Sequence, residues 1–329
     1  MSAGVALLVF AVSLAATLFA AAVFAERLDL LGHRLGLPES LIGVLTAVAA
    51  DAPELSSAVV ALATGASAVG IGVVVGSNVF NLAAMLGLSA VVVGRVRLAP
   101  EALALEGGVA LLVTVVVTLL AFGALPAWAA VLLCALVLVP YVIVVSVAEG
   151  DRPARLSLHT WRRLRRALGG RDIRRAVADR DVWGPLLVLP PAVAAIVLGS
   201  IGMVHAALDL AHRWGIPDAV VGAVLLAVLT SIPNAYTGVR LGRARRGAAL
   251  VSETMNSNTI NLVGGIAIPA LFVAIAGFST LVAVDAAWML AATAAAILLL
   301  ARRSGMGPRG GVVLILAWAG FAIVQGVWG

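Results

Sequence analysis

Long apolar stretches alternate with short polar segments along the whole chain of 329 residues. An apolar run of about 18 or more residues can cross the hydrocarbon core of a bilayer as an α-helix. The pattern predicts an all-helical (all-α) polytopic membrane protein with ten transmembrane helices, five in each half. The expected spans lie near residues 3–25, 40–64, 68–93, 101–122, 127–148, 184–212, 218–241, 248–276, 279–301 and 311–328.

Composition supports a membrane class and excludes several others. Hydrophobic residues make up 62% of the chain and charged residues only 12%, about half the charged share of a soluble domain. We expect no enzyme and no cofactor, because the sequence offers neither a nucleophile–base pair nor a histidine cluster for a metal. The first span has the length of a signal peptide but lacks a basic leading segment, so we interpret it as a transmembrane helix. The single cysteine, Cys134, lies in an apolar run and is expected to be a packing residue.

The positive charges predict an orientation. The net charge is +6, yet the arginines sit between apolar spans, which argues against a nucleic-acid partner and leaves membrane lipid as the surroundings. All 22 basic residues are arginines, and 21 of them fall in odd-numbered loops, ten in the loop at about 149–183. By the positive-inside rule these loops face the cytoplasm. We therefore expect an inner (plasma) membrane protein with both termini outside and a cytoplasmic arginine-rich loop, Arg213 being the exception.

The two halves contain one pattern twice. The segment 33–39 (HRLGLPE) matches 212–218 (HRWGIPD), and the later segment 77–82 shares Ser-Asn and Asn-Leu pairs with 257–262 at an offset of 180 residues. Because five spans per copy is an odd number, the second copy must enter the membrane from the opposite side. The predicted organisation is a first repeat at 1–148 (motif at about 43–87), the arginine-rich loop at 149–183, and an inverted second repeat at 184–329 (motif at about 222–267). Inverted repeats are typical of secondary transporters, whose ion sites lie at the midplane where helices are broken.

Each copy carries a proline inside an apolar span, at Pro53 and Pro233. Proline removes a helix hydrogen bond and frees a carbonyl, which membranes tolerate where it is buried in protein or lines a cavity. Asp51 and Glu54 flank the first break, and ionisable groups at that depth indicate function. Two carboxyl groups this close are expected to titrate as a coupled pair, which favours proton coupling.

Hydroxyl and amide side chains accompany both breaks. Together with the two acids they predict a hard-cation site suited to sodium, calcium, magnesium or protons. The alternative for each of them is helix-to-helix hydrogen bonding without an ion. The residues are Ser77 and Asn81 in the first copy, and Thr230, Ser231, Asn234, Ser257 and Asn261 in the second.

These motifs resemble those of the sodium/calcium exchanger (cation/calcium antiporter) superfamily, whose two inverted repeats carry Thr-Ser-x-Pro-Glu and Gly-Ser-Asn-x-Phe-Asn/Asp motifs. Here the segments are 50–54 (ADAPE), 76–81 (GSNVFN), 230–234 (TSIPN) and 256–261 (NSNTIN). The resemblance implies that Glu54 is the central acid and that Asn234 replaces its acidic partner. It further implies cation ligands at Asn81, Asn261, Ser77, Thr230, Ser231 and Ser257, with backbone carbonyls from Ala47 and Ala227.

The departures from the family pattern leave the transported ion open. Ala50 and Asp51 replace the hydroxyl pair, and asparagines stand at 234 and 261, so about two formal negative charges remain. Glu253 could supply another charge, although an interfacial role beside Arg245 or Arg246 is the preferred interpretation. We expect a secondary antiporter of sodium/calcium exchanger type that moves Na⁺ and Ca²⁺. A sodium/proton or other cation/proton antiporter, and a non-transporting scaffold or sensor, are the alternatives.

Overall fold

The structure is a computed structural model that describes residues 2–35, 37, 45, 47–149, 182–273 and 280–328. Almost the whole arginine-rich loop expected at 149–183 lies outside these residues, and so does part of the span expected at 40–64. The regular secondary structure of the described residues is helical, apart from one isolated antiparallel bridge between Val96 and Met306. Its helices, with π-helical η1, η2 and η3 and the 3₁₀ turn η4, are α1 (Ala3–Arg34), α3 (Ala52–Ala63), α4 (Ser67–Asn81), η1 (Leu82–Gly87), α5 (Leu88–Val93), α6 (Pro100–Ala121), α7 (Ala127–Glu149), α9 (Trp183–Trp214), α10 (Asp218–Val220), η2 (Val221–Leu226), α11 (Ala227–Thr230), α12 (Ile232–Arg243), α13 (Gly247–Leu262), η3 (Val263–Ala267), η4 (Pro269–Leu271), α14 (Thr280–Leu300) and α15 (Pro308–Trp328).

The expected membrane class is confirmed. Seven helical segments in the described chain are long and apolar enough to cross a bilayer, and the bent pair 218–230 and 232–243 raises the number to eight. The deepest of them, 67–93, joins α4, η1 and α5 and is almost wholly surrounded by the other helices. Shorter helices, among them α3 and α13, complete the bundle.

Several boundaries differ from those expected from the sequence. Helix α1 continues to Arg34 instead of ending near residue 25. No glycine or proline interrupts residues 26–31, and an Asp29–His33 pair four residues apart supports the extension. The span expected at 248–276 divides into α13, η3 and η4. Polar residues after an apolar run thus extended the first helix rather than ending it.

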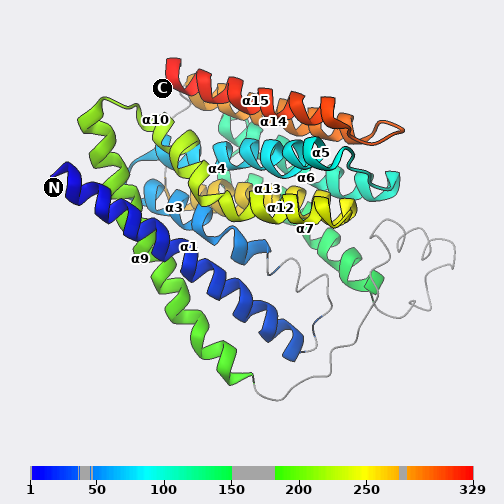
Figure 1. Cartoon of the computed structure of the whole chain (residues 1–329), viewed down its shortest axis with the longest axis horizontal. Helices are drawn as coiled ribbons and strands as arrows, with labels where there is room; N and C mark the ends of the chain where they lie inside the picture. Colours follow the sequence, from blue (N-terminus) through cyan, green and yellow to red (C-terminus); the bar gives the residue numbers. More distant parts are fainter. Residues whose placement is uncertain are drawn as a thin grey trace.

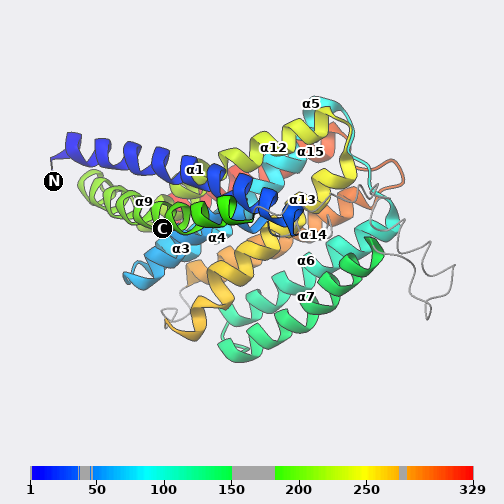
Figure 2. The same cartoon turned by 90° about the horizontal axis from the view of Figure 1, so that it is seen from below.

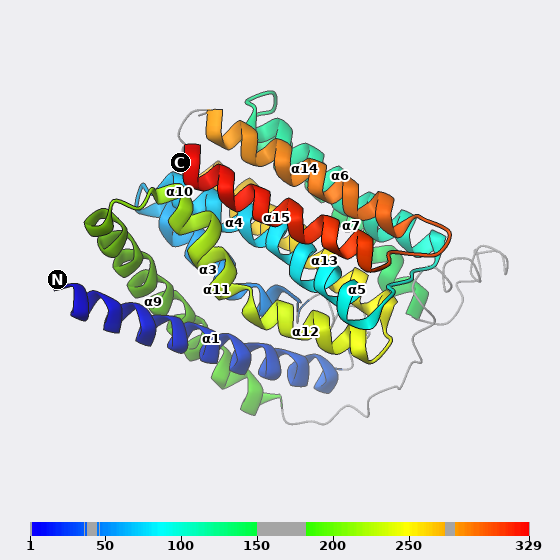
Figure 3. The same ribbon diagram turned by 45° about the horizontal axis from the view of Figure 1, so that its top comes forward.

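The helices form a two-part arrangement (Figure 1). The long helices α1 and α9 pack along each other at one side, and α3 contacts α9. The remaining helices form the main bundle, in which α6 and α7 lie side by side (Figure 2). Figure 3 shows α14 and α15 covering another flank, where α14 packs on α6 and α15 on η1 and α5. Helices α4 and α13 cross in the centre of this bundle.

Two glycines permit the central crossing of α4 with η2. A Cβ atom at Gly76 would overlap the backbone carbonyl of Ala223, and one at Gly222 would overlap the backbone of Val69. In membranes, where apolar side chains gain little from leaving lipid, such small residues allow helices to approach closely. The glycines therefore bring a helix of the first half against a helix of the second.

Both proline-associated breaks have the same backbone geometry. Asp51 has φ −85° and ψ 0°, and Ser231, its counterpart at an offset of 180 residues, has φ −88° and ψ 3°. Each residue precedes a helix with proline in its first turn, where the missing N–H costs no internal hydrogen bond. The chain bends by 48° at Ser231. A buried polar residue follows each break in the first turn of the next helix, Glu54 in α3 and Asn234 in α12.

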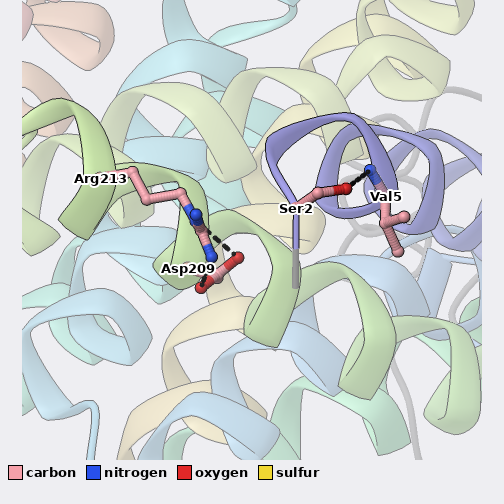
Figure 4. A network of polar contacts seen from close by, with 4 residues as sticks. All are labelled: Ser2, Val5, Asp209 and Arg213. Atoms are coloured by element: carbon pink, nitrogen blue, oxygen red, sulfur yellow. Dashed lines mark hydrogen bonds and ion pairs between the residues drawn. The ribbon is translucent and has the colours of Figure 1, made fainter.

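Polar contacts near the N-terminus and near the end of α9 are drawn in Figure 4. The hydroxyl of Ser2 accepts a hydrogen bond from the Val5 amide at 3.3 Å and caps α1. Arg213 donates to both carboxylate oxygens of Asp209, over 3.1 Å and 3.2 Å. The one arginine that departs from the charge pattern is thus paired within its own helix.

Candidate functional site

Asp51 lies at the contact between the two halves of the chain. Its side chain is 1% exposed. The Ser257 hydroxyl donates to Asp51 Oδ1 over 2.7 Å, and the Asn234 amide donates to the same oxygen over 2.9 Å. An acid of the first half is therefore held by two donors of the second, from α13 and α12.

Glu54, on the first turn of α3, is fully buried beside Asp51. Its Oε1 accepts a hydrogen bond from the Ser231 hydroxyl over 2.8 Å and a longer one from Asn234 over 3.4 Å. The Asn234 amide thus bridges both carboxyl groups. An acid at position 234, where the family pattern has one, would place a third negative charge beside the carboxyl groups of Asp51 and Glu54.

Asn81 joins the same cluster from the end of α4. Its amide donates to Ser257 Oγ over 3.1 Å and to Asn258 Oδ1 over 3.3 Å. About one turn before Asn81 on α4, Asn78 pairs with Asn258 of α13: the side-chain amide of each donates to the backbone carbonyl of the other. Helices α4 and α13 are therefore fastened together beside the two acids.

Several buried oxygens of this cluster have no hydrogen-bond partner among the described residues. They are Asp51 Oδ2, Glu54 Oε2 and Asn81 Oδ1. A buried polar atom without a partner costs about 1–3 kcal/mol, and native proteins leave few of them. Carboxylate and amide oxygens are ligands for Na⁺, Ca²⁺ and Mg²⁺, so the unpartnered atoms are candidate ligands for a hard cation.

The other predicted residues differ in how they relate to this cluster. Asn261 is fully buried, and neither polar atom of its side chain has a hydrogen-bond partner among the residues that the structure describes. Ser77 and Thr230 instead donate to backbone carbonyls one turn earlier in the chain, those of Val74 and Leu226, over 3.1 Å and 2.9 Å. Their hydroxyl hydrogens are therefore engaged by the backbone, and each hydroxyl oxygen keeps its capacity to accept.

The carbonyls of Ala47 and Ala227 accept helix hydrogen bonds. The amide of Asp51 donates to Ala47 over 3.0 Å, and that of Ser231 donates to Ala227 over 3.2 Å. A carbonyl has a second lone pair, so each keeps capacity for a ligand. Both alanines lie one turn before a break, in equivalent positions of the two copies.

Glu253 lies on the same face of α13 as Ser257 and Asn261, because this helix is regular over the eight residues concerned. Glu253 is partly buried.

Sequence reasoning missed two buried acids, Glu106 in α6 and Asp285 in α14, which are 7% and 4% exposed. Asp285 accepts a hydrogen bond from Gln325 of α15. Glu106 contacts Tyr141 of α7 and Ser252 of α13. Each is an ionisable residue within an apolar run, which is itself a signal of function in a membrane helix, and that signal could have identified both.

A family model that matches most of the chain defines its class, the membrane cation/calcium antiporters. The chain belongs to the family described as sodium/calcium exchanger protein, which matches twice, over residues 5–148 and 185–327. The resemblance seen in the motifs is thereby confirmed. The family consists of transporters, so the expectation that the chain is not an enzyme also holds.

Individual relatives agree with this assignment. The chain is 32% identical over 87 residues to the sodium/calcium exchanger MaX1 of Methanosarcina acetivorans, a stretch covering 26% of this chain and 25% of that relative. The matched stretch therefore spans about a quarter of that relative's length.

Solved structures share the fold. A crystal structure of the H⁺/Ca²⁺ exchanger CAX matches with a TM-score of 0.73 at 15% identity, covering 98% of this chain and 86% of that one. Native YfkE matches at 0.64 and 16% identity, covering 97% and 92%. The sodium-calcium exchanger NCX_Mj matches at 0.62 and 19% identity, covering 98% and 99%.

Proposed function

We propose that this chain is a secondary active antiporter that alternates access to a hard-cation site between its two halves. The single observation that carries the proposal is the set of buried, unpartnered oxygens on Asp51, Glu54 and Asn81. Asp51 and Glu54 would supply negative charge. Asn81, Asn234, Asn261 and the hydroxyls of Ser231 and Ser257 would supply neutral coordination, with Ser77, Thr230, Ala47 and Ala227 as further oxygen ligands.

Sodium/calcium exchange is the leading form of this function. The family membership supports it, and two carboxylates can neutralise one divalent cation. MaX1 and NCX_Mj, both named sodium/calcium exchangers, are among the similar proteins.

Cation/proton exchange is the second candidate, favoured by Asn234. Its amide donates to both acids, so the position that carries an acid in the family pattern here contributes a hydrogen-bond donor and no charge. Two closely spaced carboxyl groups with a donor between them can exchange a proton for a monovalent cation, because their titrations are coupled. The similarity to the H⁺/Ca²⁺ exchanger CAX is compatible with proton coupling.

Flux into proteoliposomes tests the function. Labelled calcium and sodium uptake would be followed under an imposed sodium gradient and then under a pH gradient. We compare wild type with Glu54→Gln and with the control Glu101→Gln, which removes an exposed acid at the start of α6. Calcium uptake driven by sodium and lost only in Glu54→Gln would support sodium/calcium exchange. Sodium uptake driven by pH would support proton coupling, and flux unchanged in Glu54→Gln would refute the site.

We further propose ten spans in two inverted repeats, with both termini outside and the arginine-rich loop in the cytoplasm. The matching backbone conformation at Asp51 and Ser231 and the reciprocal Asn78–Asn258 bonds support the two repeats, and the distribution of arginines between the spans supports the orientation. The single native cysteine is buried, so introduced cysteines can be labelled against a low background. Membrane-impermeant maleimide should label Ser2→Cys and Arg213→Cys in intact cells but Arg303→Cys only after lysis. The opposite pattern would reject the orientation.

A further inference from the structure

Four polar side chains form a closed ring between α6, α7 and α13. Glu106 Oε2 lies 2.8 Å from the Tyr141 hydroxyl, and Tyr141 lies 3.0 Å from Asn256 Oδ1. The Asn256 amide nitrogen lies 3.3 Å from Ser252 Oγ, and Ser252 lies 3.0 Å from Glu106 Oε1. The four contacts are all within hydrogen-bonding distance, and Glu106 and Tyr141 are buried.

The number of hydrogens in this ring decides how many of its contacts can be hydrogen bonds. Tyr141 and Ser252 each bring one hydroxyl hydrogen, and the amide of Asn256 can turn its NH₂ group toward only one of its two neighbours. An ionised Glu106 brings none. Three hydrogens must then serve four contacts, and one contact is left as two acceptors facing each other.

One added proton on Glu106 completes the ring. Glu106 then donates from Oε2 to Tyr141, Tyr141 donates to Asn256 Oδ1, Asn256 donates to Ser252, and Ser252 donates to Glu106 Oε1. Every donor has one acceptor, and the observed distances fit this cycle. The count concerns these four contacts alone and does not depend on other partners of Glu106 or Tyr141.

We propose that Glu106 is a proton-binding site, separate from Asp51 and Glu54, whose protonation closes the ring between α6, α7 and α13. Loss of the proton to water opens one contact: the Tyr141 hydroxyl then donates to the carboxylate and Asn256 Oδ1 loses this donor, while the Asn256 amide still donates to Ser252. Besides Glu106 itself, the described charged or titratable groups on the packed helices are Glu101 on α6, Cys134, Tyr141 and Glu149 on α7, Glu253 on α13 and Asp285 on α14. Of these, Asp285 bonds to Gln325 on α15.

The ring is joined to the candidate cation site through α13. Ser252 and Asn256 are four residues apart and share one face of that helix. The residue after Asn256 is Ser257, which donates to Asp51 over 2.7 Å. A change in the ring therefore acts on the backbone that positions a hydroxyl against the acid. This coupling to transport rests on the proposed function, whereas proton binding by Glu106 does not.

Infrared spectroscopy tests the proton directly, because a protonated carboxyl group has a carbonyl stretch that a carboxylate lacks. Spectra of the purified full-length protein at neutral pH would be compared for wild type, Glu106→Gln and the control Glu101→Gln. We expect one carboxylic acid band to be lost in Glu106→Gln and retained in Glu101→Gln. Glutamine preserves the ring, because its amide donates on one side and accepts on the other.

Tyr141→Phe supplies a second, independent readout with Glu106 in place. Removing the hydroxyl that Glu106 donates to should shift the same band to higher frequency, as expected for a weakened hydrogen bond. Superimposable wild-type and Glu106→Gln spectra in the carboxylic acid region, together with an unshifted Tyr141→Phe spectrum, would overturn the proposal.

Flux measurements separate this inference from the proposed function. Wild-type flux that disappears in Glu54→Gln would support the cation site whatever the state of Glu106. We expect Glu106→Gln to transport while losing at least part of the pH dependence of wild-type flux. An identical pH profile would overturn the coupling between the ring and the cation site.

Discussion

The side-chain amide of Asn78 donates to the backbone carbonyl of Asn258 over 3.1 Å, and the amide of Asn258 donates to the carbonyl of Asn78 over 3.0 Å. The two residues are 180 positions apart and both are buried. A reciprocal pair of this kind is what an approximate twofold relation between two copies of one repeat produces. The bonds connect α4 with α13 directly beside Asp51 and Glu54.

Replacing either asparagine by alanine should destabilise the protein by about 1 kcal/mol, the size typical of hydrogen bonds between membrane helices. Asn258→Ala should cost more, because its Oδ1 also accepts from Asn81. Thermal unfolding in detergent measures both. The control is Ser89→Ala, which removes a buried hydroxyl that has no hydrogen-bond partner among the described residues. Stabilities of both asparagine variants equal to that of the control would contradict a fastening role.

Asn234→Asp should change ion preference. The new carboxylate would stand where an amide now donates to Asp51 over 2.9 Å and to Glu54 over 3.4 Å. Like charges at this distance repel strongly in a buried site, so the variant should be less stable without a divalent cation and gain more stability from calcium than wild type does. Thermal shifts with calcium and with sodium measure this. A variant that responds to both ions as wild type does would argue against Asn234 lying in the cation site.

The hydroxyl groups of Ser257 and Thr230 should not contribute equally to the apparent affinity for the cation. Ser257→Ala removes a donor to Asp51 and an acceptor for Asn81. A hydrogen bond to a charged group contributes about 1.5–3 kcal/mol, so apparent cation affinity should change on the order of tenfold or more. Thr230→Val is the comparison, because this hydroxyl donates to the backbone carbonyl of Leu226, one turn earlier in the chain.

Concentration dependence of flux distinguishes the two hydroxyl variants. We expect Thr230→Val to change the affinity less than Ser257→Ala does. A larger effect of Thr230→Val would mean that the Thr230 oxygen is a cation ligand in spite of its helix hydrogen bond.

Gly76→Ala should prevent the close approach of α4 and η2. The added methyl group would overlap the carbonyl of Ala223, a backbone atom that cannot rotate away. Gly108→Ala is the matched control, because a Cβ there meets nothing within 4 Å. Yield and monodispersity after purification should fall for Gly76→Ala and remain at wild-type level for Gly108→Ala. Wild-type yield and monodispersity of both variants would show that the crossing of α4 and η2 can widen without destabilising the protein.

Sequence alone identified the membrane class, the family and most of the polar residues that meet in the bundle. Apolar run length predicts helices because lipid leaves a backbone no other partner for its hydrogen bonds. The spacing of Pro53 and Pro233 within matching motifs predicted where helices break, and both breaks are present. The site residues themselves remain a proposal. Helix ends were less predictable, since α1 extends to Arg34 through polar residues that favour a helix as well as a loop.

Tertiary structure decided which way the polar groups turn. Ser257 and Ser77 stand in equivalent motifs, yet Ser257 reaches Asp51 while Ser77 donates to Val74. The choice depends on the rotation of each helix against its neighbours, which local sequence does not encode. The ring around Glu106 likewise needs three helices that are distant in sequence. The amino-acid sequence thus determined which residues enter the membrane, and the packing of the two halves determined which of those residues face one another.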